Sequence, residues 1–311
     1  MTRPSLAFLF ASALTLAACP RAQADEACTL LRIESLDLKT GTDGEVAVPI
    51  VLNDRPSEMV IDIGSISTIL TEDTVASLGL RQRISPVNAT LVNNVEIDKE
   101  VKIESVGLGR LHGHGSWPML VMPDGLVPPT AAGLLGNNFL EKYDAEFDFF
   151  HGKLNLFQHH TCSEPVYWTH DPFAVAKMID RNEGHVTVEA MLDGKRVKVT
   201  LDTGSPDSAM SLDAARRLFG WDEKDPRIRR VTTARINGGA TAVLYDYPFA
   251  SLTFDGVTIT SPKITLVPQD NFTGERDADI LIGMSVLRRL HLYIAYEEGQ
   301  VYLTSAETSS P

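Results

Sequence analysis

The chain has 311 residues, of which 43% are hydrophobic, so its length fits two domains of about 100–150 residues, each able to bury a core. Its formal charge of −13 makes the surface acidic, which disfavours nucleic acid and anionic membranes as partners. Beyond the N-terminal segment, no stretch approaches the roughly 18 continuous apolar residues of a membrane-spanning helix, so we expect no transmembrane segment.

The first 24 residues have the features of an export signal. Arg3 supplies a positive start, and the apolar run 6–18 has the length of a signal h-region. An A-x-A cleavage sequence follows at 22–24, so we predict a signal peptide over residues 1–24 and an exported protein, periplasmic or secreted. A less favoured alternative stays open, because Cys19 ends a lipoprotein-like box and could carry a lipid anchor.

Cleavage at that point leaves two cysteines, Cys28 and Cys162. Because an exported protein enters an oxidising compartment, a disulfide between them is the favoured prediction. Two unpaired thiols are the alternative. A catalytic cysteine is not favoured, because neither residue has a neighbouring base in the sequence.

The first predicted elements form a hairpin followed by a helix. Apolar residues alternate with others in the manner of a half-buried strand at Val46, Val48, Ile50 and Leu52. A turn at Asn53-Asp54 leads into a second strand, which ends at Asp62. Thr71 suits a helix N-cap and is followed by acidic residues. Further strands, a short helix over 139–143 and a last hairpin complete this part of the chain.

A connector and a second run of the same elements follow. Residues 158–184, with their prolines and histidines, predict the connector. Two strands joined by a hairpin turn at Asp193-Gly194 then lead to Asp202. Ser211 suits the N-cap of the next helix, and a short helix is expected over 284–290 before the last hairpin.

Two aligned segments show that the chain contains an internal repeat. A shift of 140 residues places 52–78 on 192–218 without a gap. This shift places Asp62, Gly64 and Ser65 on Asp202, Gly204 and Ser205. A shift of 147 residues places Leu134-Leu135-Gly136 on Leu281-Ile282-Gly283. We therefore predict a tandem duplication of one β-rich lobe, with lobe 1 over residues 25–157 and lobe 2 over residues 185–311.

The repeated motifs resemble those of aspartic proteases. In that family a strand ends in Asp followed by x-Gly-Ser, and an apolar-apolar-Gly sequence passes behind this active-site turn. Both copies carry both motifs, and their length is closer to a retropepsin subunit than to a pepsin lobe. The resemblance covers roughly residues 45–157 and 185–304. It implies a mainly β fold with two tandem retropepsin-like acid-protease lobes of the closed β-barrel type and an active-site cleft between them.

The resemblance also implies a reaction. Asp62 and Asp202 would share one site and would activate a water molecule that hydrolyses a peptide bond, without metal, cofactor or covalent intermediate. The implied partner is a peptide or protein substrate. Gly64 and Gly204 would allow the tight turn behind each carboxylate. Ser65 and Ser205 would donate hydrogen bonds to the outer carboxylate oxygens.

One position departs from the family pattern. In the family, a Thr after each Asp bonds to the backbone of the opposite lobe and locks the two turns together. The second copy has this residue as Thr203, whereas the first copy has Ile63. An isoleucine cannot make this bond, so the lock would be half-made. A catalytically weak or inactive peptide-binding protein on the same fold is therefore a second interpretation, and a purely structural or assembly role is a third.

The family also closes a hairpin over its substrate. In the second copy Gly238 and Gly239 resemble the tip of such a flap, and Asn93-Asn94 is the nearest equivalent in the first copy. An ordinary hairpin turn is the alternative at both places. Because both aspartates lie on one chain, we expect a monomer with internal two-fold symmetry. The sequence does not indicate which substrate is cleaved.

Overall fold

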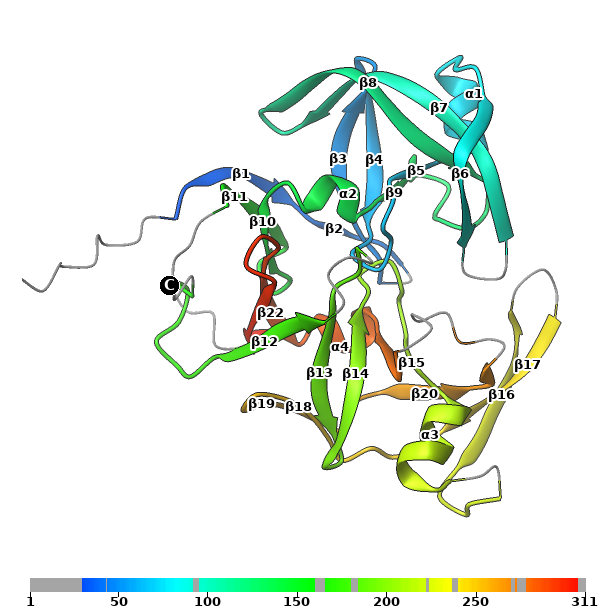
Figure 1. The fold of residues 1–311 in the computed structure, drawn as a ribbon, viewed down its shortest axis with the longest axis vertical. Helices are drawn as coiled ribbons and strands as arrows, with labels where there is room; N and C mark the ends of the chain where they lie inside the picture. Colours follow the sequence, from blue (N-terminus) through cyan, green and yellow to red (C-terminus); the bar gives the residue numbers. More distant parts are fainter. Residues whose placement is uncertain are drawn as a thin grey trace, which may run out of the picture.

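The computed structural model describes residues 30–42, 44–91, 95–159, 166–179, 184–221, 224–236, 240–269, 272 and 278–306. Over these residues the chain is mainly β and forms two lobes with a sheet between them (Figure 1). Among the described residues, no helix has the length and apolarity needed to cross a bilayer. Several predictions fall on residues outside this set: the signal peptide, Cys19, Cys28, Cys162, Gly238 and Gly239.

Lobe 1 is built around a closed barrel of six strands. Its strand order is β3-β4-β9-β5-β8-β7, and β7 closes the barrel by pairing with β3 at Val51↔Gly107 and Leu52↔Val106. The elements of this lobe are β2 (Lys39–Thr40), β3 (Val46–Leu52), β4 (Arg55–Ile61), β5 (Ile69–Thr71), α1 (Glu72–Ser77), β6 (Arg83–Leu91), β7 (Val95–Leu108), β8 (Leu111–Met122), β9 (Gly133–Leu135) and α2 (Asn137–Leu140).

Lobe 2 repeats this order with two interruptions. Pro248 lies between β17 and β18, and Pro262 lies between β19 and β20, where lobe 1 has the continuous strands β7 and β8. The elements are β13 (Thr187–Leu192), β14 (Lys195–Leu201), β15 (Ser208–Ser211), α3 (Leu212–Phe219), β16 (Arg229–Ile236), β17 (Ala240–Asp246), β18 (Ser251–Phe254), β19 (Val257–Thr260), β20 (Ile264–Val267), β21 (Ile280–Ile282) and α4 (Met284–Leu287).

The registers of equivalent strands confirm the internal repeat. In lobe 1, β4 runs parallel to β9 with Ile61 opposite Leu135. In lobe 2, β14 runs parallel to β21 with Leu201 opposite Ile282. These are the pairs that the shifts of 140 and 147 residues relate. The two lobes are therefore copies of one supersecondary unit, as the sequence predicted.

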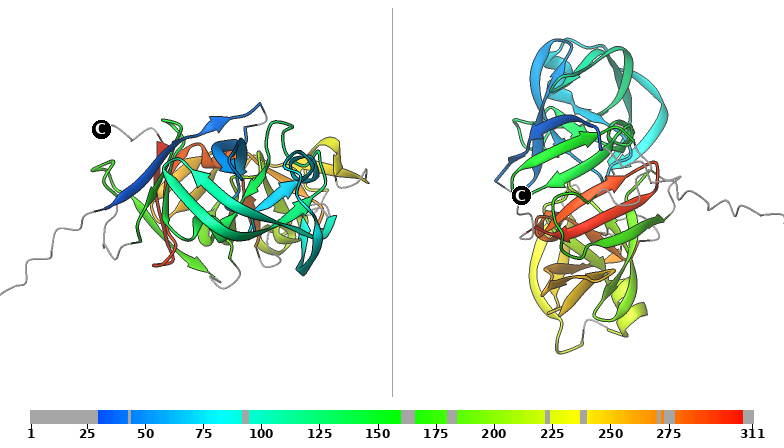
Figure 2. Two further views of the ribbon diagram at one scale, coloured as in Figure 1. Left: turned by 90° about the horizontal axis from the view of Figure 1, so that it is seen from above. Right: turned by 90° about the vertical axis from the view of Figure 1, so that its left-hand side faces the viewer.

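A six-stranded antiparallel sheet joins the lobes. Its order is β1 (Arg32–Asp37), β11 (Lys153–Phe157), β10 (Asp144–Asp148), β22 (Leu290–Ala295), β23 (Gln300–Ser305) and β12 (Ala174–Ile179). The right-hand view of Figure 2 shows this sheet extending across both lobes. At its centre Glu146 lies opposite Tyr293, which is its counterpart in the repeat, so the internal two-fold axis passes between them.

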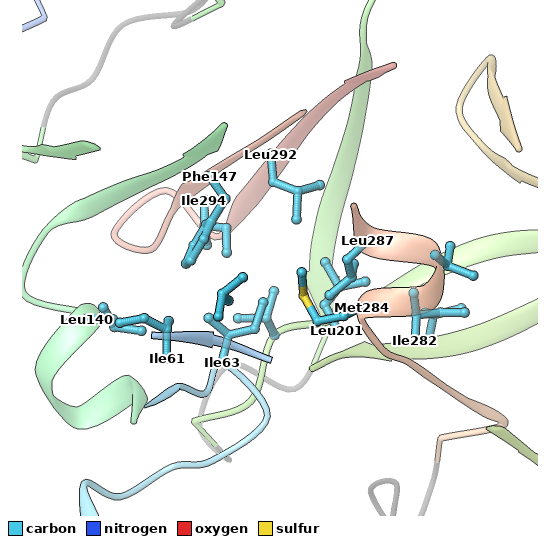
Figure 3. Close-up of a cluster of buried hydrophobic side chains, with 14 of the residues drawn as sticks. Ile61, Ile63, Leu140, Phe147, Leu201, Ile282, Met284, Leu287, Leu292 and Ile294 are labelled. Atoms are coloured by element: carbon cyan, nitrogen blue, oxygen red, sulfur yellow. The ribbon is translucent and has the colours of Figure 1, made fainter. Parts of the chain in front are cut away.

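The two faces of this sheet differ. Phe147, Leu292 and Ile294 lie on one face and belong to the main core, which also contains Ile61 and Leu201 next to the two aspartates (Figure 3). The opposite face carries a buried polar network, with His291 Nε2 2.7 Å from Glu146 Oε1 and the Tyr167 hydroxyl donating to Glu146 Oε2 at 2.7 Å. The Trp168 ring stacks on His291 at 4.2 Å and covers this network.

The connector is more regular than its composition suggested. Strand β12 lies inside residues 158–184, and the Tyr167-Trp168 pair of the same stretch packs on the interlobe sheet. Both predicted caps are confirmed: Thr71 accepts from the Thr74 N–H, and Ser211 accepts from the Ala214 N–H. The short helices expected over 139–143 and 284–290 exist as α2 and α4, but each ends earlier, because the chain turns into β10 and β22, and α2 begins two residues before its predicted start.

Candidate active site

The two aspartates follow equivalent strands and meet where the lobes meet. Asp62 comes directly after β4, and Asp202 comes directly after β14. The neighbouring strands hold both backbones, since the Asp62 N–H donates to Leu135 O at 3.0 Å and the Asp202 N–H donates to Ile282 O at 2.9 Å. Only 8% of Asp62 and 9% of Asp202 is exposed to solvent. The structure thus brings together two carboxyl groups that lie 140 residues apart in the chain.

The glycines of the two turns make room for the opposite carboxyl group. A Cβ atom at Gly64 would lie 2.7 Å from Asp202 Oδ1, and one at Gly204 would lie 2.7 Å from Asp62 Oδ2. Real Cβ atoms do not approach oxygen so closely, so any side chain here would push the carboxyl groups apart. The requirement for glycine is therefore reciprocal: each lobe leaves the space that the aspartate of the other lobe occupies.

The downstream glycines allow the turns to be braced from behind. A Cβ at Gly136 would lie 2.9 Å from Ser65 O, and one at Gly283 would lie 2.6 Å from Ser205 O. Backbone N–H groups of the short helices fill the same role in both lobes. The Asn137 N–H donates to Ser65 O at 2.8 Å, and the Met284 N–H donates to Ser205 O at 2.8 Å.

Burial raises the pKa of both carboxyl groups, and the neighbouring carboxyl group raises that of Asp62 further. The pKa of Asp62 lies well above its usual range because the group is desolvated and because Asp202 carries negative charge beside it. Burial also raises the pKa of Asp202, while hydrogen bonds from Asp62 and from the backbone oppose the rise. Asp202 Oδ1 accepts from the N–H groups of Gly204 at 2.8 Å and Ser205 at 3.1 Å. The Gly64 N–H donates to Asp62 Oδ1 at 2.9 Å.

Thr203 ties the two turns together. Its hydroxyl donates to Ile61 O at 2.7 Å and accepts from the Ile63 N–H at 3.2 Å, so it clamps the backbone on both sides of Asp62. Ile63 has no hydroxyl to return this contact and is fully buried in the apolar cluster of Figure 3. The half-made lock predicted from the sequence is what the structure contains.

The hydroxyls of Ser65 and Ser205 do not have the predicted role. Ser65 donates to Ser67 O and Ser205 donates to Asp207 O, both at 2.9 Å. Each hydroxyl closes its own turn by bonding to the carbonyl two residues ahead, a contact open to serine in loops. The Asp202 carboxyl accepts from two backbone N–H groups of its turn instead.

One polar residue behind the site was missed in the sequence. Asn137, directly after the Leu-Leu-Gly motif, is 1% exposed, and its side-chain amide donates to Ile63 O at 2.6 Å. The repeat held a signal for it, because the shift of 147 residues places this asparagine on Met284. An amide aligned with an apolar residue marks a place where the two copies differ.

A hairpin is present at each of the two places where a flap was predicted, and its role as a flap stays a prediction. β6 and β7 form one in lobe 1, β16 and β17 form the other in lobe 2, and both lie on the same side of the molecule (Figure 1). Asn93-Asn94, Gly238 and Gly239 fall in sequence between the paired strands and lie outside the described residues. Within the part of the chain that the structure describes, no three His, Cys, Asp or Glu side chains are grouped to hold a metal ion.

A comparison with protein families shows to which family the chain belongs. An aspartyl protease family model matches residues 48–139 and, separately, residues 188–286. The chain belongs to the aspartyl protease family. Each matched region is one lobe and contains one Asp-x-Gly-Ser turn with its downstream apolar-apolar-Gly motif. Family membership thus covers both halves of the site that the lobes form together. No curated protein sequence matches the chain.

Proposed function

We propose that this protein is an aspartic endopeptidase that uses Asp62 and Asp202 as one catalytic pair. The observation that carries the proposal is the reciprocal fit of the turns, in which each glycine leaves the space taken by the opposite carboxyl group. Two neighbouring carboxyl groups cannot both ionise readily, so the pair holds one proton near mildly acidic pH. That is the protonation state from which water can be activated and a carbonyl polarised at the same time.

The surroundings of the two carboxyl groups favour opposite roles. Each accepts backbone N–H bonds from its own turn, but the negative charge of Asp202 raises the pKa of Asp62 further, whereas the hydrogen bond from Asp62 opposes the rise at Asp202, so Asp202 acts as the general base. Asp62 holds the proton. Asp202 takes a proton from water as the oxygen attacks the peptide carbonyl carbon, while Asp62 gives its proton to the carbonyl oxygen. When the tetrahedral intermediate collapses, Asp202 protonates the leaving nitrogen and Asp62 recovers a proton from the hydroxyl.

The test is cleavage of a peptide library at several pH values by the mature protein and two variants. Asp62→Asn and Asp202→Asn should each reduce cleavage to background, because the pair acts as a unit and either loss removes it. Asp213→Asn is a matched control, since this carboxylate is exposed on α3 and pairs with Arg216. A transition-state mimic with a statine-type hydroxyl should block the wild type. Wild-type activity in either active-site variant would refute the shared pair.

A second candidate function is peptide binding without turnover. The observation that favours it is the one-sided tie, in which Thr203 has no counterpart at Ile63. A mispositioned pair would still offer a binding surface between the lobes. Saturable binding of library peptides by a wild type that cleaves none of them would select this candidate over the first.

A further inference from the structure

Asn137 contacts two separate segments, the Asp62 turn and the chain that enters lobe 2. Its backbone N–H donates to Ser65 O, and its side-chain nitrogen donates to Ile63 O at 2.6 Å and to Gly184 O at 2.9 Å. Gly184 lies just before the first strand of lobe 2. Asn137 therefore links the active-site turn of Asp62 by hydrogen bonds to the chain that enters lobe 2.

Tyr296 fixes the orientation of that amide. It lies directly after β22, on the lobe 2 side of the interlobe sheet, and its hydroxyl donates to Asn137 Oδ1 at 2.8 Å. With the oxygen accepting from a hydroxyl, the nitrogen must point at the two carbonyls. Burial, with the negative charges of Glu141 and Asp144, raises the pKa of Tyr296, so the hydroxyl stays a donor over the whole acidic range.

The polar chain from Tyr296 through Asn137 to the Ile63 carbonyl has no equivalent in the other half of the repeat. The shift of 147 residues places Asn137 on Met284 and Tyr296 on Phe149. Neither replacement has a side-chain hydrogen-bond donor. The polar chain thus reaches the turn of Asp62, the turn in which isoleucine replaces the hydroxyl that would tie it to lobe 2.

We infer that Asn137 and Tyr296 are positioning residues for Asp62, and that together they supply an interlobe tie that Ile63 does not make. The inference rests on the proposed function, because positioning matters only if the two carboxyl groups act as a pair. A fixed Ile63 carbonyl fixes the Ile63–Gly64 peptide plane, and the N–H of that plane donates to Asp62 Oδ1 at 2.9 Å, so the plane helps to set the direction in which the carboxyl group faces Asp202. Small errors in such geometry lower a rate without abolishing binding.

The kinetic test removes one oxygen atom. Tyr296→Phe should lower kcat by about three- to tenfold, the worth of one hydrogen bond, and leave KM within about twofold. Tyr302→Phe is the matched control, because it also removes a hydrogen-bonded tyrosine hydroxyl, one that donates to Glu298 and Gln300. Asn137→Leu should cost more. In that background Tyr296→Phe should cost nothing further, since the hydroxyl acts through the amide.

A second readout needs no substrate. The two pKa values of the carboxyl pair can be followed by NMR of carbon-13-labelled aspartate side chains and assigned with Asp62→Asn. Loosening the turn weakens the coupling between the carboxyl groups, so the two pKa values should move closer together in Tyr296→Phe and stay apart in Tyr302→Phe.

The outcomes separate the inference from the proposed function. A wild type that cleaves nothing defeats the function, yet the titration still tests the positioning role. Equal kcat and equal pKa separation in Tyr296→Phe and in Tyr302→Phe would overturn the inference, as would additive losses in the double variant. Should Asn137→Leu fail to fold, the comparison of the two tyrosine variants decides.

Discussion

The Asp62 carboxyl lies beside a second carboxyl in a nearly dry site, and this arrangement links stability to pH. Its folded-state pKa is raised by burial and by Asp202, so the folded protein holds a proton that the unfolded chain releases. A raised carboxyl pKa gives stability that is fully present below the unfolded value of about 3.9 and is lost as pH rises through the folded pKa. At neutral pH the ionised pair therefore opposes folding.

Removing this charge is expected to stabilise the fold while it removes activity. Asp62→Asn should unfold at a higher temperature than the wild type at pH 8 and at the same temperature at pH 3. For a chain of this size, each kcal/mol corresponds to roughly 2–4 °C. Thermal unfolding followed by circular dichroism across pH checks this, with Asp213→Asn as control. A variant less stable than the wild type at pH 8 would contradict the raised pKa.

Ile63 packs in the apolar core and is also part of the active-site turn. Replacing it with threonine should therefore lower the stability of the fold and raise activity. Ile63→Thr removes buried apolar volume, so the free energy of unfolding should fall by about 1 kcal/mol. The new hydroxyl would occupy the place related by the internal two-fold axis to that of Thr203, within reach of the backbone of the Asp202 turn. We expect kcat/KM to rise by no more than about tenfold. Denaturant titration and kinetics on one preparation measure both effects.

A fall in activity, or a rise in stability, would contradict the expectation for Ile63→Thr. A stably folded Ile63→Thr variant with lower activity would show that the isoleucine belongs to the working site. An increase in stability would show that the hydroxyl finds better partners than the apolar cluster of Figure 3 indicates.

The elements that carry the site could be predicted because their signals are local. Alternation predicted the strands before Asp62 and Asp202, side-chain chemistry predicted the caps at Thr71 and Ser211, and the ungapped repeat related one lobe to the other. The glycines of the turns could be assigned for the same reason, because a motif of four residues contains them.

The two hairpins of the interlobe sheet, β10–β11 and β22–β23, could be predicted, but its outer strands β1 and β12 could not, although the repeat extends into them. β1 pairs with β11 and β12 pairs with β23 in registers that the repeat relates, with Leu36 opposite Leu154 and Ala176 opposite Val301. β1 and β12 share almost no sequence, because such strands need only alternation and free backbone groups to pair. No local pattern could mark them as equivalents.

Contacts between distant segments were the other limit of the sequence. Glu146 lies in a strand whose acidic residues alternate, a pattern typical of a solvated face, yet Tyr167 and Trp168 bury it against His291. Asn137 and Tyr296 lie 159 residues apart, and neither is unusual in its own neighbourhood. A buried polar side chain finds its partner only once the fold has formed, so the tie behind Asp62 had to come from the structure.

The two lobes of the molecule are related by one internal two-fold axis and pack against each other across it. Its main hydrophobic cluster runs without a break from Val48 in lobe 1 through Phe147 to Leu252 in lobe 2. β10 and β22 pair across the axis, and the Thr203 hydroxyl crosses it to the backbone of the first turn. An interface that two identical chains would have to form by association is here part of a single chain.

The internal two-fold axis also bears on the oligomeric state. Both carboxyl groups, both turns and the β10–β22 pairing come from one polypeptide, so no second chain is needed to complete the site. We propose that the working form is a monomer. Its rate per molecule should stay constant on dilution from about 1 µM to about 1 nM, because mass action affects only sites shared between chains. Initial rates across that range, with sedimentation at the upper end, measure this. A steep loss on dilution, recovered at high concentration, would show that each site draws on a second chain, and the internal axis would then not suffice for activity.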